Sequence, residues 1–493
     1  MTILQKFRLF LCLLLPVTAL ADDLSTANYK LKFSANDPKT IEVEAKISLK
    51  NNKIRMASWG HPALPHGWGT FVDELVVKDD KNNLLQATPN TKDGWGAWVV
   101  EGEDGLPLTL SYKVSLTQDE YDWNPAGGQD SRPAVTENVI FLVTKALFIY
   151  SPGLGQSTVE MNVPENWKIS APWRNKPGAP DTFEVDSWVS LVNNALVVGD
   201  HYERVIQDGD MEIVLAVDNA LRAHVDLFQE VFQSQLSNFR KVYDATPKVK
   251  YLVTLRGANE DDGESFNNSF NQVIIAENLE RRKIVWANTM SHELFHYWNG
   301  DHSKRSEDTY WFTEGFTEYY SSLTLFRTGI IEESLYFKKV ERYLSRYHIT
   351  MNMNPEEAVS LVQAGHQKHK NWLQVYGGGA TLALVLDLNI RHATQGKKSL
   401  DDVMRLLNQR FKLQGLQFEI KNIAQIVSEV SGKDYQPFFK DHVLATGHKL
   451  DLAKALSFAG LELAQFTDEF YIIKTPLPTE NQQSIYQGWT SDL

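Results

Sequence analysis

The chain has 493 residues, of which 43% are hydrophobic and 23% charged. This composition is ordinary for a globular protein and excludes a mainly disordered, collagen-like or coiled-coil chain. At roughly 100–200 residues per domain, the length predicts two to four domains. The formal net charge is −13 and no Lys/Arg-rich run occurs. Because a nucleic-acid partner requires a basic surface to neutralise its phosphates, we expect none.

The N-terminal segment has the pattern of a secretory signal peptide. Lys6 and Arg8 precede a short apolar run over residues 9–20, and residues 19–21 read Ala-Leu-Ala, a small-residue cleavage motif. The run is short for a bilayer span, and the sequence shows no second apolar stretch of spanning length. We therefore expect cleavage after Ala21 and an exported protein, periplasmic or secreted, with no membrane span after cleavage.

The single cysteine of the chain, Cys12, lies inside this signal segment. The mature chain would then contain no cysteine, which excludes disulfide scaffolds, thiolate metal sites and cysteine catalysis. An exported protein without cysteine is consistent with a bacterial envelope compartment.

Residues from about 28 to 218 read as β-strands. Apolar residues occupy every second position of 41–49, which is the pattern of a half-buried strand. Similar short apolar runs recur at 108–114, 139–150 and 212–217, and clusters of turn-forming residues separate them. The pattern predicts an all-β sandwich domain.

The pattern becomes mainly helical further along the chain. Residues 220–243 carry apolar side chains at helical spacing, and two strand-like runs follow at 250–255 and 272–276. Between residues 281 and 460 we expect mainly helices. In the tail, one strand-like run at 470–474 precedes polar residues.

A zinc-binding pattern stands at residues 292–296, which read His-Glu-Leu-Phe-His. On a helix, His292 and His296 lie on one face one turn apart, where their imidazoles can bind one Zn²⁺. Glu293 lies beside them, close enough to accept a proton from a zinc-bound water. The Asn-Gly pair at 299–300 is a plausible end of this helix. The alternative is two ordinary surface or core histidines.

A zinc site of this class needs a third protein ligand and one open position for water. The aromatic-rich stretch 311–320 contains Glu314, which we predict as the third ligand. Glu318, one turn later, could accept a hydrogen bond from the outer nitrogen of a ligand histidine; a solvated helix carboxylate is the alternative. Glu307 competes as the third ligand, but its polar surroundings indicate a loop.

These residues predict hydrolysis by a zinc-activated water. The metal lowers the pKa of bound water towards about 7, and Glu293 accepts the proton and passes it to the leaving amine. The oxyanion that develops needs a second donor besides zinc. Tyr376, before a Gly-rich turn, is the candidate, although a Tyr that caps a turn is common. His366 and His369 could approach substrate, but surface histidines are the simpler interpretation.

The residues of these motifs resemble the glycyl aminopeptidase family of thermolysin-like (gluzincin) zinc metallopeptidases. The resemblance is strong at residues 292–299, 311–320 and 376–379, and it extends weakly over most of 28–465. It implies a multidomain α+β protein, in which an N-terminal antiparallel β-sandwich domain precedes a thermolysin-like, mainly helical catalytic domain.

The resemblance also implies the components of the active site. It assigns one Zn²⁺ per chain to His292, His296 and Glu314, with Glu293 as the general base, Tyr376 as the donor to the transition state, and a peptide as the substrate. Together, the sequence patterns and the resemblance divide the chain into five predicted segments. These are residues 1–21 (signal peptide), 22–218 (N-terminal β domain), 219–395 (zinc catalytic domain), 396–465 (C-terminal helical region) and 466–493 (tail).

One segment departs from the family pattern. Relatives carry a Gly-Gly-Leu-Glu-His or Gly-x-Met-Glu-Asn segment whose Glu binds the free amine of the substrate. The matching stretch here is 262–269, in which the family Glu falls on Ser265 or Phe266. Glu264 and Asp262 are the candidates to replace it, because a buried ammonium needs a nearby carboxylate. The predicted function is a zinc metallopeptidase, with aminopeptidase activity as one form. An endopeptidase and a catalytically altered peptide-binding protein are the alternatives.

Overall fold

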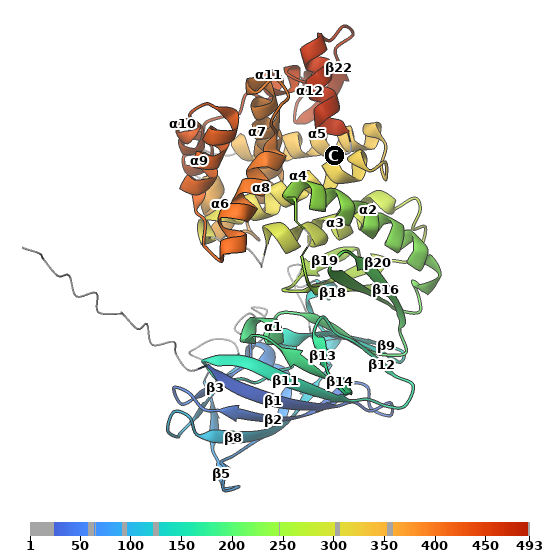
Figure 1. Ribbon diagram of the computed structural model, residues 1–493, viewed down its shortest axis with the longest axis vertical. Coiled ribbons are helices and arrows are strands. Elements are labelled where there is room, and N and C mark those ends of the chain that lie inside the picture. Colours follow the sequence, from blue (N-terminus) through green and yellow to red (C-terminus); the bar gives the residue numbers. More distant parts are fainter. Residues whose placement is uncertain are drawn as a thin grey trace, which may run out of the picture.

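The computed structural model describes residues 24–491, except for a few short segments. The predicted signal peptide, including Cys12, lies outside the described residues. The described chain forms a β-rich N-terminal body and a helical C-terminal body, with a five-stranded sheet between them (Figure 1). The predicted fold class is thereby confirmed. The segments outside the description are residues 1–23, 58–63, 65, 91–95, 122–127, 246, 301–305, 353–357 and 492–493.

An eight-stranded sheet forms the outer layer of the N-terminal body. In spatial order its strands are β13 (Arg174–Lys176), β14 (Ala179–Val185), β11 (Leu154–Asn162), β1 (Ser25–Lys32), β2 (Thr40–Ser48), β8 (Pro107–Ser115), β4 (Val72–Lys78) and β5 (Leu84–Leu85). Neighbouring strands are antiparallel, apart from the parallel pair β1 and β11. Every second residue of β2 is buried, as the alternating sequence predicts.

Two smaller sheets complete the sandwich. They contain β12 (Lys168–Ser170), β15 (Ala195–Gly199), β10 (Val139–Val143) and β9 (Ala134–Thr136), and β3 (Lys53–Arg55), β7 (Ala97–Val100) and β6 (Ala87–Pro89). Residues of all three sheets share one hydrophobic cluster. The apolar run 139–150 is not one strand, because β10 ends at Val143 and a 3₁₀ turn, η4 (Thr144–Ala146), follows.

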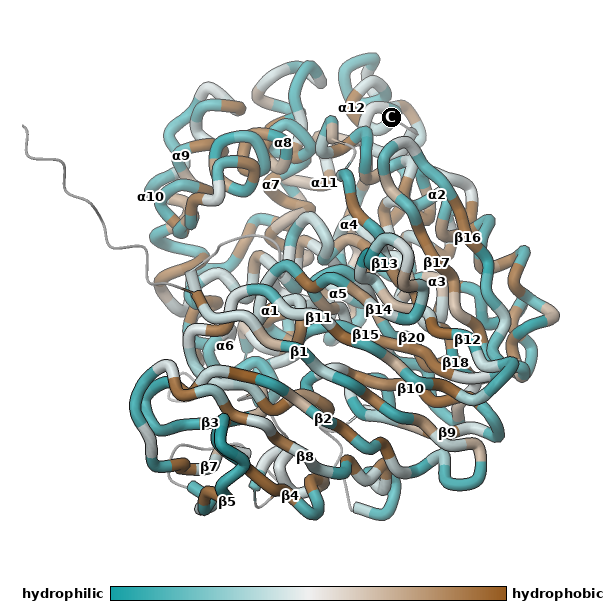
Figure 2. The backbone as a smooth tube through the Cα atoms, turned by 60° about the horizontal axis from the view of Figure 1, so that its bottom comes forward, coloured by the Kyte–Doolittle hydropathy of each residue, from teal (hydrophilic) through white to brown (hydrophobic). Residues whose placement is uncertain are grey.

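Strands β10 and β15 are buried on both faces. One face joins the core of the sandwich, and the other packs on the five-stranded sheet through a small cluster that includes Phe141, Val197 and Leu252. Figure 2 shows the corresponding hydrophobic stretches along β10 and β15. A strand covered on both faces reads as a continuous apolar run rather than an alternating one, which explains why periodicity did not resolve the end of β10.

The five-stranded sheet carries the site region. In spatial order its strands are β16 (Tyr202–Asp208), β17 (Met211–Val217), β18 (Lys250–Ala258), β20 (Ser269–Ile275) and β19 (Asp262–Ser265). The three central strands are parallel, and β16 and β19 are antiparallel edges. The sheet therefore crosses the predicted domain boundary at residue 218. Apolar residues of β16 and β17 join the core of the helical body, so a division near residue 200 follows the two cores more closely.

Helices form most of the second body, as the sequence predicts after residue 281. Helix α2 agrees with the predicted helix at 220–243, although it begins at Val225. The helices of this body are α2 (Val225–Tyr243), α3 (Lys283–Asn299), α4 (Tyr310–Arg327), α5 (Glu333–Met351), α6 (Leu361–His366), α7 (Gly379–Ala393), α8 (Leu400–Arg410), α9 (Ile420–Ser431), α10 (Gln436–Phe439), α11 (Leu452–Ser457) and α12 (Glu480–Thr490).

One described segment, Leu373–Ala393, is long and apolar enough to cross a membrane, although the sequence analysis expected no second apolar stretch of that length. It comprises α7 and the preceding π-helical turn η7 (Leu373–Gly378). Within its most apolar window, 78% of the segment is buried inside the protein. A core helix passes the same test of length and composition.

The C-terminal tail has more structure than the sequence analysis predicts. Strands β21 (Leu461–Phe466) and β22 (Glu469–Lys474) form a hairpin, and α12 follows it. A capping box between Thr479 and Gln482 starts α12, which is the pattern expected at a helix N-terminus. The sequence analysis did not find this helix, because only two apolar residues mark its buried side.

Helix α12 packs on the back of α4. Trp489 is fully buried, and its indole N–H donates to the hydroxyl of Tyr319 at 2.9 Å. In return, Nε of Arg327 donates to the backbone carbonyl of Trp489 at 3.0 Å. The last helix of the described chain is therefore part of the core behind α4.

A buried histidine lies where the chain passes from the sandwich to the five-stranded sheet. His201 is 2% exposed, and its Nε2 lies 2.6 Å from Oγ of Ser170. Burial, together with the positive charge of Lys168, lowers the pKa of His201 to about 4. The native state therefore holds this imidazole neutral at a pH at which an exposed histidine is protonated.

We expect this histidine to make the protein less stable in acid. Between about pH 6.5 and pH 4 the unfolded chain binds a proton at His201 that the native state does not, so the free energy of unfolding falls by about 3 kcal/mol as the pH falls. His201→Gln should remove this component. Urea unfolding of both proteins at several pH values between 4 and 7 measures the difference, and parallel curves would contradict it.

Candidate metal and catalytic site

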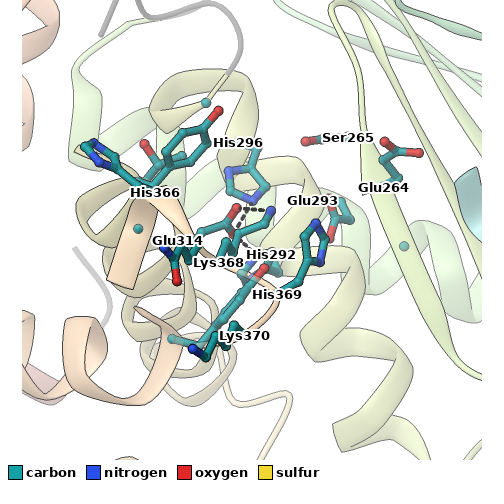
Figure 3. A pocket seen from close by; sticks show the side chains of 17 residues that line it. Glu264, Ser265, His292, Glu293, His296, Glu314, His366, Lys368, His369 and Lys370 are labelled. Carbon is teal, nitrogen blue, oxygen red and sulfur yellow. Dashed lines mark hydrogen bonds and ion pairs between the residues drawn. The ribbon is translucent and has the colours of Figure 1, made fainter. Parts of the chain in front are cut away.

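Three side chains from α3 and α4 converge in a cavity beside β19. His292 and His296 come from α3, and Glu314 comes from α4. Their potential ligand atoms all lie within 4.8 Å of one another. Oε2 of Glu314 lies 3.5 Å from Nε2 of each histidine, and Figure 3 shows the three groups facing one another. The structure thus brings together the three predicted metal ligands.

The sequence positions these groups through one helix repeat and one close helix contact. The two histidines are four residues apart on α3, so their rings project from the same face, with ring centroids 4.7 Å apart. Gly315 lies against the start of α7, where an added Cβ atom would be 2.4 Å from Cα of Gly379. The two helix backbones therefore touch, which places Glu314 beside the turn that carries Tyr376.

Glu318 lies behind His292, on the side away from the converging atoms. Its Oε2 is 3.3 Å from Nδ1 of His292, while Oε1 accepts hydrogen bonds from Lys339 at 3.0 Å and from the hydroxyl of Tyr343 at 3.1 Å. Glu318 is only 7% exposed, so it is not a solvated carboxylate. This contact orients Nδ1 of His292 towards Glu318 and leaves Nε2 for a metal, as is usual for metal-binding histidines.

Lys368 forms an ion pair with Oε1 of Glu314, whereas Oε2 is the oxygen near the two histidines. The sequence analysis did not predict this ion pair. Nζ of Lys368 donates to Oε1 of Glu314 at 2.9 Å. Burial alone would raise the pKa of Glu314, but Lys368 and the two histidines outweigh it and lower the pKa well below its usual value. No sequence signal could have found this pair, because the two residues are 54 positions apart and meet only in the fold.

Glu293 has the opposite electrostatic environment. Burial is the main cause that raises its pKa, and neighbouring carboxylates add to it although the charge of His292 opposes it. A Cβ atom at Gly263 of β19 would lie 2.9 Å from Cγ of Glu293, so only glycine allows the strand to approach so closely. The site therefore keeps Glu314 ionised and makes Glu293 easy to protonate. Two carboxyl groups whose pKa values are shifted in opposite directions are typical of a metal ligand and a proton carrier.

The donor set fits a divalent cation of the zinc type. Burial alone would lower the pKa of His292, but its contacts with Glu314 and Glu318 raise it to about 10. The site thus attracts positive charge to the point between the histidines. Two imidazole nitrogens and one carboxylate oxygen, all from buried residues, are a common ligand set of catalytic zinc.

Tyr376 lies in the π-helical turn η7 and lines the same cavity. Its ring stacks on that of His292, with the centroids 6.0 Å apart and the planes at 27°. Burial is the main cause that raises the pKa of Tyr376, so the phenol stays protonated at neutral pH. A neutral O–H donor therefore lies in the cavity beside the predicted ligand His292.

The cavity has a volume of about 720 Å³, within the usual range for ligand sites. Glu264 lines it, but both of its carboxylate oxygens lie 3.0 Å from Nζ of Lys145, a residue of the N-terminal body. Asp262 begins β19 and is exposed. Phe266 is 3% exposed and belongs to the core of the sandwich, so its side chain does not replace the family carboxylate. Glu307 is exposed and does not belong to the His-His-Glu group.

Comparisons with known proteins agree with this geometry. The model of a family described as M61 glycyl aminopeptidase matches residues 285–380, and that of the peptidase M61 N-terminal domain matches residues 28–200. No curated protein matches the chain.

Two solved structures are similar. An aminopeptidase N family protein from Idiomarina loihiensis has a TM-score of 0.72 at 19% identity, over 89% of this chain and 79% of that one. Legionella pneumophila aminopeptidase A, solved in complex with aspartic acid, has a TM-score of 0.51 at 13% identity, over 85% of this chain and 49% of that one. At such identities the likeness shows the fold alone.

The contact between Gly315 and Gly379 predicts a sharp effect of one methyl group. Gly315→Ala should destabilise the protein by about 1–3 kcal/mol, because the added carbon forces α4 away from α7, and should weaken metal binding. Gly378→Ala is the matched control, since its Cβ atom would meet nothing closer than 3.5 Å. Thermal unfolding and zinc titration of both variants measure the effect. Equal stability of the two variants would argue against the contact.

The contact between Glu318 and His292 predicts a loss of metal affinity without a loss of ligands. Glu318→Gln preserves size but removes the charge that orients the imidazole, and such changes typically reduce affinity about 10–100-fold. Competition with a chelating dye measures the zinc dissociation constant, with the exposed Glu307→Gln as control. An unchanged constant would show that Glu318 is only a packing residue.

Proposed function

The chain belongs to the M61 glycyl aminopeptidase family, and from that premise we propose that it is an exported zinc peptidase that removes residues from the N-terminus of peptides. The observation that carries the proposal is the convergence of two imidazole nitrogens and one carboxylate oxygen within 4.8 Å, with a protonatable glutamate beside them. Export is supported by the signal-like pattern of residues 1–21.

His292, His296 and Glu314 would hold the zinc ion. When bound, the ion would polarise the scissile carbonyl and acidify a water molecule. Lys368 keeps Glu314 ionised and in place through its Oε1, and Glu318 keeps the ring of His292 in the orientation that exposes Nε2.

Glu293 and Tyr376 would carry out the proton transfer and the stabilisation of developing charge. Glu293 takes the proton from the attacking water and later gives it to the leaving amine, which its raised pKa allows. Tyr376 donates its phenolic hydrogen to the carbonyl oxygen as negative charge develops there. Because burial keeps this phenol neutral, it can donate without a preceding deprotonation.

The wall of the cavity near β19 supports recognition of a free amine. Glu264 is neutralised by Lys145, but the neighbouring Asp130 and Asp262 have no cation paired with them among the described residues. Asp130 is 6% exposed, and its pKa is raised by burial and then by the negative charges of Asp262 and Glu264. An α-ammonium group would relieve this repulsion and offset its own desolvation.

The proposal predicts that zinc and Glu293 are both required. The purified protein should contain one zinc per chain, and a chelator should abolish peptide hydrolysis until zinc is restored. Glu293→Gln should reduce kcat by about 10²–10⁴-fold with the zinc content unchanged, whereas Glu307→Gln should leave kcat as in the native protein. Metal analysis and mass spectrometry of digested peptides give both results.

The same digestion separates exopeptidase from endopeptidase activity. Peptides with a free N-terminus should be cleaved at the first bond, and their acetylated counterparts should not. Cleavage of the acetylated peptides alone would indicate an endopeptidase. Binding of peptides without any turnover would favour the peptide-binding alternative, which the altered family segment at 262–269 suggests.

A further inference from the structure

One stretch of five residues places four potentially cationic side chains on the cavity wall. His366, Lys368, His369 and Lys370 all line the cavity, in a chain whose net charge is −13. Figure 3 shows Glu264 and Ser265 on one side of the ligand histidines and His366 on the other. His366 and β19 therefore border the metal site from different sides.

Two of these four side chains already have an anionic partner. Nζ of Lys368 is 2.9 Å from Glu314, and Nε2 of His366 is 2.8 Å from Oδ1 of Asp308. In the described part of the chain, the side chains of His369 and Lys370 have no ion-pair or hydrogen-bond partner, and both residues are exposed. The uncompensated positive charge on this wall therefore comes from Lys370, and His369 beside it offers a free ring N–H.

Acidic side chains lie at β19 and close to it. Glu264 lines the cavity and pairs with Lys145. Burial and neighbouring carboxylates raise the pKa of Asp130 and of Asp262. The same cavity thus has acidic side chains at β19 and unpaired basic side chains at residues 369–370. A ligand that carries an ammonium at one end and a carboxylate beyond its first peptide bond matches this arrangement.

We propose that His369 and Lys370 bind a carboxylate on the leaving-group side of the substrate. This inference rests on the proposed function and specifies its substrate class. The carboxylate has two possible sources, the C-terminus of a dipeptide or tripeptide and the side chain of Asp or Glu downstream of the cleaved bond. In both cases a charge-assisted hydrogen bond forms with a lysine and a histidine that are otherwise unpaired.

The physical basis is charge pairing in a confined space. A salt bridge on an open surface contributes little because water and salt screen it. Inside a cavity, less water and salt surround the two charges, and the screening is weaker. The cavity volume of about 720 Å³ suits a short peptide. The same positive charge would contribute nothing to a substrate that lacks a carboxylate near the cleaved bond.

Binding to the inactive Glu293→Gln protein tests the proposal without turnover. Calorimetry compares Ala-Phe and Gly-Phe with their C-terminal amides, with zinc loaded and at pH 6.5. The free acids should bind at least tenfold more tightly than the amides. Adding His369→Gln and Lys370→Gln should reduce the preference to less than threefold, whereas Lys397→Gln, at an exposed lysine outside the cavity, should leave it unchanged.

A second set of peptides identifies the source of the carboxylate. Amidated Ala-Phe-Asp and Ala-Asp-Phe carry the charge only on a side chain. Tight binding of these amides would assign the site to acidic residues, and tight binding of the free acids alone would assign it to the C-terminus. Either result supports the proposal.

Equal affinity for acids and amides, or an unchanged preference after the double substitution, would overturn the proposal. Because this measurement does not depend on turnover, it is independent of the hydrolysis experiment. An acid preference without hydrolysis would leave the binding inference standing and contradict the zinc peptidase instead. The unfolding temperature of the double variant confirms that these two exposed positions do not alter the fold.

Discussion

The burial of two carboxylates on α4 is the constraint on which the site depends. Glu314 and Glu318 lie one turn apart and are 6% and 7% exposed, and an uncompensated buried charge is strongly unfavourable. Their compensation comes from three other parts of the chain, namely the histidines of α3, Lys339 of α5 and Lys368 after α6. The charges of α4 therefore hold the surrounding elements in a fixed arrangement around one cavity.

Glu293, another carboxylate of the cavity, shows the effect of this compensation. Glu293 has no lysine or arginine recorded beside it in the described structure, and neighbouring acids add to the effect of its burial. Two glutamates of similar burial thus differ in how readily they accept a proton. The N-terminal body takes part as well, because Lys145 crosses to the wall of the cavity and neutralises Glu264. The charge pattern of the cavity consequently depends on the packing of the two bodies.

The sequence predicted the elements that depend on local spacing. His292 and His296 are related by one helical turn, and the aromatic residues around Glu314 indicated a second buried helix. It could not predict Lys339, Lys368 or Lys145, because these contacts join distant segments and any exposed lysine has the same local pattern. The sequence also did not predict that β16 and β17 belong to the five-stranded sheet. The alternation of apolar and polar residues along a strand does not show which strand lies beside it. The segment around Phe266 departs from its family, and there the resemblance gave no side chain for the amine.

The contact between α12 and α4 has a consequence for the order in which the protein can mature. Trp489 and Tyr319 are separated by 170 positions in the chain, so the ribosome adds the indole long after it has made the helix that carries Glu314. Until then, the hydroxyl of Tyr319 and the guanidinium of Arg327 lack their partners from α12. The core behind the ligand helix is therefore completed only late in synthesis, and a nascent chain that already contains every residue of the cavity does not yet have the finished support behind it.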